Sequence, residues 1–436
     1  MTNIVNNKFE VSIGLSRKWN ARAAGKEVAK EIIQKLKQPP SFVLLFSTIH
    51  YKSHGGFHEL LKGVWEVLPD KTPLIGGTIA CFVNNYGCFS RGVTALAVSY
   101  PNMDVTIGLG KNTKISPKKA ARNCSGMIKL GLKNSGYKNK LLINMISMGK
   151  LPDLPYFGRI HIIKSKAIGW IATYIGLKVF PYFGYGFGKE EEVIDELSRL
   201  IPEYNIIGGS SVDSNDILDN YQFIDKKVMT NCIVALGISI DLPIDMKTTL
   251  NLHKTNTKFN ITKTSRDGRL IKKINNLPAK KQLLDMLKLN EEQFSEFGPF
   301  YYRVSNYLPF IFEENPKFTS GMGGFFGNNI YLGYKSRGKK ACLCSITGKD
   351  ILDIIDDNIN RGQTEQYPFV FMSSSSILLN TLGSKSHEIK KMLDTYLNET
   401  PYLMIGPITE NFGTTNERAI ARVYSFNSIS FKLSKL

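Results

Sequence analysis

The sequence predicts an α/β protein in which mixed sheets carry helices, with two domains built from repeated units. Three observations predict this class. Apolar runs of strand length alternate with helical patterns, a glycine-containing stretch recurs, and the same order of elements surrounds each recurrence. The three stretches are Pro73–Cys81 (PLIGGTIAC), Asn205–Asp213 (NIIGGSSVD) and Pro401–Thr409 (PYLMIGPIT).

Each stretch occupies the same place in a frame of strand, helix, strand, glycine turn, strand and strand. In the first copy, Leu60, Leu61, Val64 and Leu68 recur at the spacing of one helix face. Opening strands are expected at Phe42–Phe46, Leu141–Ile146 and Phe369–Met372, and closing strands at Val93–Tyr100, Ile233–Ile240 and Ala419–Phe431. Paired glycines after a strand permit positive φ or a close approach of another backbone or a ligand, so packing and ligand binding both remain open.

The remaining elements follow in chain order. Residues 1–37 form an N-terminal extension with a strand at Val11–Leu15 and a helix near Arg22–Leu36. Ser116 and Pro117 open a helix that Gly136 ends. A polar stretch near residue 245 separates a domain of residues 38–245 from one of residues 246–436. In the second domain we expect a hairpin of Phe259–Thr264 and Arg269–Ile274, helices at Pro278–Leu289 and Asp350–Ile359, strands at Tyr301–Phe312, Ile330–Tyr334 and Ala341–Ile346, and a loop at Asn315–Phe326.

Composition favours a soluble, globular, cytoplasmic protein. The 436 residues are 42% hydrophobic and 21% charged, with a net charge of +19. The lysines are spread along the chain, so neither a nucleic-acid surface nor a membrane contact is expected. The six cysteines show no framework spacing and are expected to be reduced. Ile168–Gly188 is long and apolar but contains glycines, a proline and Lys178, which favours an aromatic loop over a spanning helix.

The order of these stretches resembles the FIST family, an intracellular sensory module with N-type and C-type halves. The N-type half is matched by PLIGGTIAC, GVTALAVSY, IIGGSSVD and CIVALGIS, and Phe259–Ala279 is similar to the opening of the C-type half. Where the family has a strand ending in Ser-Cys and a glycine-glutamate turn, this chain has Ser374, Ser375 and Gly406–Glu410. A function that depends on that cysteine is therefore in doubt.

The resemblance implies sensing of a small polar ligand, such as an amino acid, and signalling to a separate partner protein such as a kinase. The ligand is expected at the glycine stretches, where free N–H groups and hydroxyls follow strands. The candidate ligand-binding residues are Ser47, His50, Gly76, Gly77, Thr78, Gly208, Gly209, Ser210 and Ser211. No catalytic residue, metal site or cofactor is expected.

Two alternatives remain open. The first is a haem-binding nitric-oxide or redox sensor, because His50, His54 and His58 are spaced four apart near a strand end. Glycines 55 and 56 interrupt a helix there, so solvated loop histidines are also expected. The second alternative is a hydrolase-like enzyme that uses the hydroxyls of Ser373–Ser376, although no G-x-S-x-G elbow surrounds them.

Overall fold

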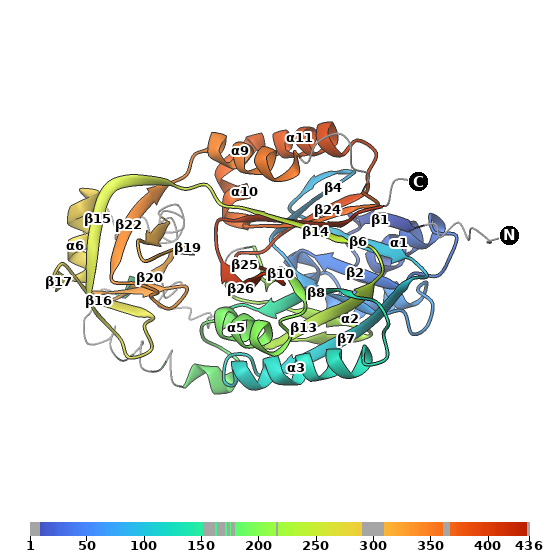
Figure 1. Cartoon of the computed structure of the whole chain (residues 1–436), viewed down its shortest axis with the longest axis horizontal. Helices are drawn as coiled ribbons and strands as arrows, with labels where there is room; N and C mark the ends of the chain where they lie inside the picture. Colours follow the sequence, from blue (N-terminus) through green and yellow to red (C-terminus); the bar gives the residue numbers. More distant parts are fainter. Residues whose placement is uncertain are drawn as a thin grey trace.

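The computed structural model describes residues 9–150, 162–163, 171, 175, 179–214, 217–289, 309–360 and 367–433. It confirms the α/β class: mixed sheets alternate with helices along the chain. In Figure 1, a body of three sheets lies on the right and a smaller lobe of strands lies on the left. Of the predicted segment Ile168–Gly188, residues 171, 175 and 179–188 are described and include a short 3-10 helix, and the other positions lie outside the described residues.

Three six-stranded sheets form the body, and they share one strand order. At the centre of each sheet, two parallel strands are flanked by an antiparallel strand from the same part of the chain. The three parallel pairs are β2 (Phe42–Ser47) with β3 (Leu74–Thr78), β8 (Asn139–Ser147) with β10 (Asn205–Ser211), and β23 (Val370–Ser374) with β24 (Tyr402–Gly406). The flanking strands are β6 (Val93–Ser99), β13 (Cys232–Ile240) and β27 (Phe426–Phe431), and the outer strands beyond them are β1 (Glu10–Ser16), β7 (Met103–Lys111) and β14 (Ile244–Thr249).

A hairpin from another part of the chain completes each sheet. The hairpin that follows β3 pairs with β24, the hairpin that follows β10 pairs with β3, and the hairpin that follows β24 pairs with β10. These hairpins are β4 (Cys81–Asn84) with β5 (Gly87–Phe89), β11 (Gln222–Ile224) with β12 (Lys227–Met229), and β25 (Glu410–Thr414) with β26 (Glu417–Arg422). The exchange ties strands from both sides of residue 245 into common sheets, while the division into domains there stays a prediction.

The body has an apolar centre between the sheets and helices outside them. Alternation along β2 explains both layers: Leu44 and Phe46 join the central core, whereas Val43 and Leu45 face the outer helices. Residues from β8 and β23, such as Ile143 and Phe371, contribute to the same centre. The helices are α1 (Ala21–Gln34), α2 (Gly56–Trp65), α3 (Pro117–Gly131), α5 (Glu190–Leu200), α9 (Gly348–Ile359), α10 (Ser376–Leu382) and α11 (His387–Leu397).

The smaller lobe is inserted between β14 and α9. It contains the long strand β15, which pairs with β16 in the predicted hairpin and with β22 on its other side. Its elements are β15 (His253–Thr264), β16 (Leu270–Ile274), β17 (Leu277–Pro278), α6 (Ala279–Leu287), β18 (Phe310–Phe312), β19 (Asn315–Ser320), β20 (Met322–Phe326), β21 (Asn329–Leu332) and β22 (Lys340–Ser345). Within the body and this lobe, the described residues also include β9 (Ile162–Ile163) and the short 3-10 helices η1 (Ile49–Ser53), η2 (Phe180–Phe183) and η3 (Gly383–Ser386).

The structure corrects three local predictions. The glycine pairs at 76–77 and 208–209 lie inside strands β3 and β10 rather than in turns. Residues 315–326, expected as a loop, form β19 and β20 because neighbouring strands supply hydrogen-bond partners despite the glycines. Helix α3 ends at Gly131, before the expected Gly136. Residues 301–308 of the strand predicted at Tyr301–Phe312 lie outside the described residues.

Candidate functional site

The carboxyl ends of the central strands meet in the middle of the body. Main-chain hydrogen bonds join the three glycine-containing stretches: Val212 N donates to Thr78 O at 2.9 Å, and Ser210 N donates to Thr409 O at 2.9 Å. A third bond, from Ala80 N to Gly406 O at 3.2 Å, connects the first stretch with the last. The structure therefore brings together the strand ends on which ligand binding was predicted.

The predicted hydroxyls at this junction are fully buried and bonded to the protein itself. Thr78 Oγ1 accepts from Tyr221 N at 3.0 Å, and Ser210 Oγ accepts from Thr409 N at 3.1 Å. Ser47 Oγ donates to Thr48 O at 3.1 Å, and Ser211 Oγ donates to Ile146 O at 3.2 Å. These hydroxyls hold the strand ends in place, and a ligand would meet the groups above them first.

The four predicted glycines allow close approach of neighbouring chains. A Cβ on Gly76 would lie 1.7 Å from Leu45 O, and one on Gly208 would lie 2.1 Å from Asn144 O. A Cβ on Gly77 would meet Tyr221 O at 2.7 Å, and a Cβ on Gly209 would meet the ring of a proline at 2.6 Å. Packing alone therefore accounts for the absence of side chains at these positions.

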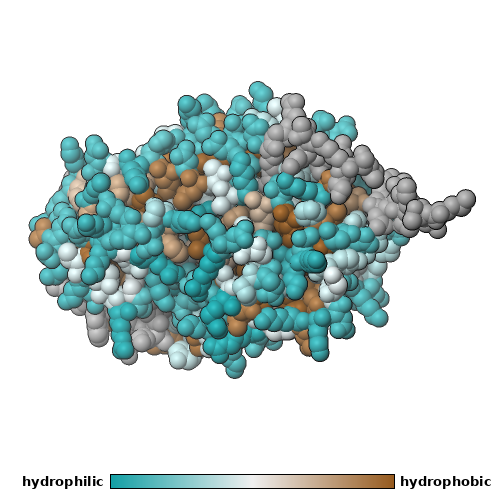
Figure 2. Space-filling model, in the orientation of Figure 1, coloured by the Kyte–Doolittle hydropathy of each residue, from teal (hydrophilic) through white to brown (hydrophobic). Residues whose placement is uncertain are grey.

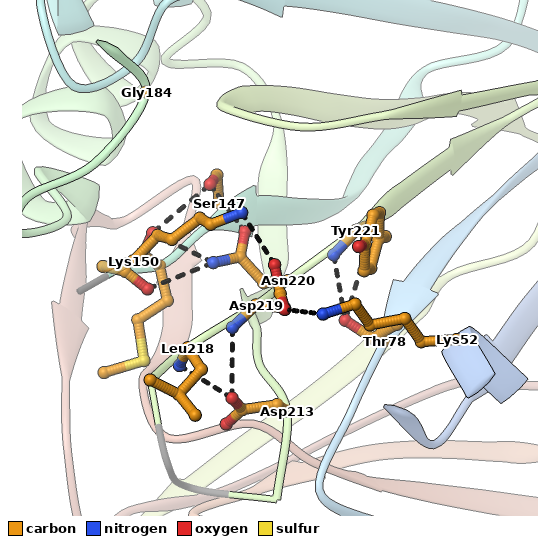
Figure 3. A network of polar contacts seen from close by, with 12 residues as sticks. Lys52, Thr78, Ser147, Lys150, Gly184, Asp213, Leu218, Asp219, Asn220 and Tyr221 are labelled. Carbon is orange, nitrogen blue, oxygen red and sulfur yellow. Dashed lines mark hydrogen bonds and ion pairs between the residues drawn. The ribbon is translucent and has the colours of Figure 1, made fainter. Parts of the chain in front are cut away.

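Above the junction, two lysines hold one carboxylate. Lys52, in η1 after β2, forms an ion pair with Asp219 Oδ2, and Lys150, shortly after β8, lies 2.7 Å from Asp219 Oδ1. Figure 3 shows the two ammonium groups reaching the carboxylate from different sides. Lys52 and Lys150 are 54% and 29% exposed, whereas Asp219 is 13% exposed. We call these three residues the lysine-aspartate site.

The loop that carries Asp219 is fixed at both ends. Asp213 accepts hydrogen bonds from the N–H groups of residues 217, 218 and 219, at 3.0, 2.8 and 3.1 Å. Asn220 accepts from Ser147 Oγ at 2.7 Å and donates to Met148 O and Gly149 O at 3.3 and 3.1 Å. The loop therefore presents Asp219 against the ends of β2 and β8, in one defined arrangement.

Electrostatics favour the charged forms of Asp219 and Lys52. Partial burial raises the pKa of Asp219, but hydrogen bonds from Lys150 and Lys52 outweigh burial and hold the pKa below its usual range. The hydrogen bond to Asp219 raises the pKa of Lys52 against the opposing effect of burial. The carboxylate of Asp213 also acts on Lys52, so the positive charge is partly balanced, but the two partly exposed ammonium groups still suit an anionic ligand.

Two buried titratable groups, Lys114 and Glu190, act on each other's pKa, and the charge of Lys150 also acts on Lys114. Lys114 is 2% exposed and donates to Gly184 O at 2.8 Å, and Glu190 at the start of α5 is 4% exposed. Burial lowers the pKa of Lys114 to about 8 and raises the pKa of Glu190 to about 7. Both groups therefore titrate near neutral pH, close to the site that Lys150 helps to form.

His50, a predicted ligand-binding residue, lies beside this site but points into an aromatic cluster. Its Nδ1 is 2.8 Å from Thr48 Oγ1, and its ring contacts Tyr51 at 3.8 Å between centroids. Burial, helped by the charge of Arg91, lowers the pKa of His50 to about 4. Trp19 stacks on Arg91, whose guanidinium carbon lies 3.9 Å from the ring centroid.

The alternatives find less support in the described residues. His50 and His54 lie 5.9 Å apart between ring centroids, His58 is exposed on α2, and no metal-binding group of histidine, cysteine or acidic side chains occurs in the described part of the chain. Ser373 Oγ and Ser375 Oγ donate to main-chain carbonyls of Gly208 and Ile408. All six cysteines are free thiols, as expected.

The sequence did not indicate Lys52, Lys150 or Asp219 as functional residues. They belong to no motif, and Lys52 and Asp219 are 167 positions apart. The one available signal was position, because Lys52 and Lys150 follow closely after Ser47 and Ser147, the last residues of two parallel strands.

In many small-molecule-binding domains, the binding site lies at the ends of the strands of a sheet. The chain belongs to the FIST domain family, whose FIST N domain model matches residues 41–277, and this confirms the predicted resemblance. FIST domains are sensory domains.

No curated protein matches the chain. Among solved structures, the chain is similar to cyanuric acid hydrolase from A. caulinodans at 6% identity, over 98% of this chain and 100% of that chain. The TM-score of 0.35 is too low for that likeness to carry an argument. Among the described helices, none combines the length and the apolar character that crossing a membrane requires.

Proposed function

We propose that this protein is a cytoplasmic sensor that binds a small molecule carrying a carboxylate, such as an amino acid, and signals to a separate partner protein such as a kinase. The family supports a sensory role, and the lysine-aspartate site supports the class of ligand. The ligand would bind above the buried strand ends, rather than on the hydroxyls and glycines themselves.

One observation carries the proposal: two lysines from different strand ends converge on a single carboxylate. An ordinary surface ion pair has one cation for each carboxylate, and the pair contributes little to stability. Here a second lysine is present, although the two ammonium groups repel each other. Such an arrangement is typical of a site that recognises an anion. Asp219 occupies the position that the ligand's carboxylate would take.

Signalling follows from competition between the two carboxylates. A ligand that pairs with Lys52 and Lys150 displaces Asp219, while the Asp213 and Asn220 contacts still hold the two ends of its loop. The same loop leads into β11, which pairs with β3 of another sheet. Release of Asp219 would therefore shift the population of loop arrangements at a junction between two sheets, and a partner could recognise the change.

A thermal-shift panel tests this function, because a ligand that binds only the folded state raises its melting temperature. The panel contains the amino acids, succinate, nucleotides and haem, with sodium chloride at matched ionic strength as the blank. We expect a carboxylate compound to raise the melting temperature of the wild-type protein and to lose this effect in Lys150→Gln.

The matched control is Lys226→Gln, which removes an exposed lysine that pairs with Asp70 away from the site. This variant is expected to respond as the wild type does. A shift with haem alone would favour the haem sensor, and a carboxylate shift that survives in Lys150→Gln would refute the assignment of the site. Turnover of an ester or amide that Ser373→Ala abolishes would favour the hydrolase.

A further inference from the structure

The outer face of α3 combines unpaired lysines with exposed apolar side chains. Lys118 and Lys129 on α3, and Lys133 just beyond its end, are exposed, and within the described residues none of them forms an ion pair. On the same solvent-facing side, Leu130 is 75% exposed and Met127 is 45% exposed. Leu130 and Met127 are three positions apart, so they are neighbours on the helix surface and form an exposed apolar pair.

The charge around this helix has one sign. Between Asp104 and Asp153 the sequence contains ten lysines and arginines and no aspartate or glutamate. Arg122 is partly neutralised by Glu196 of α5, at 3.1 Å, while the lysines of the outer face remain available. The result is a positive surface that favours an anionic partner.

A second exposed apolar group lies at the start of α3. In η2, Tyr182 is 73% exposed and Phe183 is 71% exposed. The bond from Lys114 Nζ to Gly184 O, at 2.8 Å, fixes this turn beside the residues that lead into α3. In Figure 1, α3 runs along the lower edge of the molecule, and in Figure 2 hydrophobic surface interrupts the hydrophilic surface along that edge.

We propose that this α3 surface, made by α3 and η2, docks the protein on an anionic lipid bilayer. Lysines attract acidic headgroups, and exposed leucine, methionine and aromatic side chains enter the boundary with the acyl chains. A nucleic acid would match the lysines but would leave Leu130 and Met127 against a polar backbone. The proposal departs from the expectation that the protein has no membrane contact, which rested on lysines being spread evenly.

Co-sedimentation with lipid vesicles tests the proposal. The full chain is mixed with vesicles of pure phosphatidylcholine, and with vesicles in which about three-tenths of the lipid is phosphatidylserine. Binding is expected only to the phosphatidylserine vesicles. It should weaken strongly between about 0.1 M and about 0.5 M salt, because added salt shortens the distance over which the lysines and the headgroups attract each other. The double variant Lys118→Glu/Lys129→Glu is expected to bind at least about tenfold more weakly.

Two further variants keep the test specific. Lys30→Glu/Lys227→Glu makes the same change in net charge at exposed positions elsewhere, and its binding should stay within about threefold of the wild type. Leu130→Ser/Tyr182→Ser leaves the charge unchanged and should also weaken binding. Equal loss in the two charge variants, unchanged binding in Leu130→Ser/Tyr182→Ser, or tighter binding to an oligonucleotide than to the vesicles would overturn the proposal.

Discussion

The buried carboxyl group of Glu190 makes the stability of the fold depend on pH. Burial raises its pKa to about 7 in the folded protein, above the value of about 4.3 for an unfolded chain. The folded state therefore holds a proton that the unfolded state has already released. The stabilisation is fully present below about pH 4 and is lost as the pH rises through 7.

The size of this effect follows from the pKa values. Between pH 5.5 and pH 8, linkage at about 1.4 kcal/mol per pKa unit predicts that Glu190 lowers the free energy of unfolding by about 2 kcal/mol. Glu190→Gln removes the titration, so the variant should gain about that much relative to the wild type over the same range. Urea unfolding at both pH values measures the difference.

The control for this experiment is Glu203→Gln, which replaces an exposed carboxylate near the end of α5. Its free energy of unfolding should follow that of the wild type at both pH values, because the substitution changes no buried group. Parallel pH dependence of Glu190→Gln and wild type would refute the reasoning, because it would mean that Glu190 is ionised at pH 5.5 in the folded protein.

Two further predictions concern packing. Gly76→Ala should lower the free energy of unfolding by about 3 kcal/mol or more, because its Cβ would lie 1.7 Å from Leu45 O. Gly126→Ala, on the exposed face of α3, is the matched control: its Cβ would meet no atom outside its own helix within 4 Å, so it should be neutral or stabilising in the same urea titrations. Arg269→Ala should lower the free energy of unfolding by about 3–5 kcal/mol, because Arg269 and Glu191 are each 4% exposed and form an ion pair between the inserted lobe and α5. Hydrogen exchange should accelerate in β16, and unchanged protection there would contradict the role of this pair.

The sequence was informative where structure depends on local pattern. The alternation in β2 and the helical spacing in α2 predicted both elements, because side chains of each element must bury one face. Residues 315–326 were misread because their glycines indicate a loop, whereas β18 just before them and β21 just after them pair with them as hairpins. The positions of Gly76 and Gly77 were predicted to matter, but their conformation was set by the strand beside them.

The candidate site was only partly predictable for the same reason. The strand ends at Thr78 and Ser211 were found because glycine and hydroxyl residues follow apolar runs. Lys52, Lys150 and Asp219 become neighbours only after β2 and β8 are placed in adjacent sheets and the loop before β11 crosses between them. No periodicity or motif records a contact of that kind.

The most direct test of the central claim, that Asp219 stands in for the carboxylate of a ligand, is a calorimetric titration of Asp219→Asn with L-glutamate, succinate and acetate. Asp70→Asn, which removes an exposed carboxylate paired with Lys226, is the control. Removing the internal competitor should tighten binding of at least one of these carboxylates by about tenfold, since the tethered carboxylate competes at a high effective concentration. Affinity that is unchanged or weaker in Asp219→Asn, in a variant that keeps the wild-type melting temperature, would contradict the account.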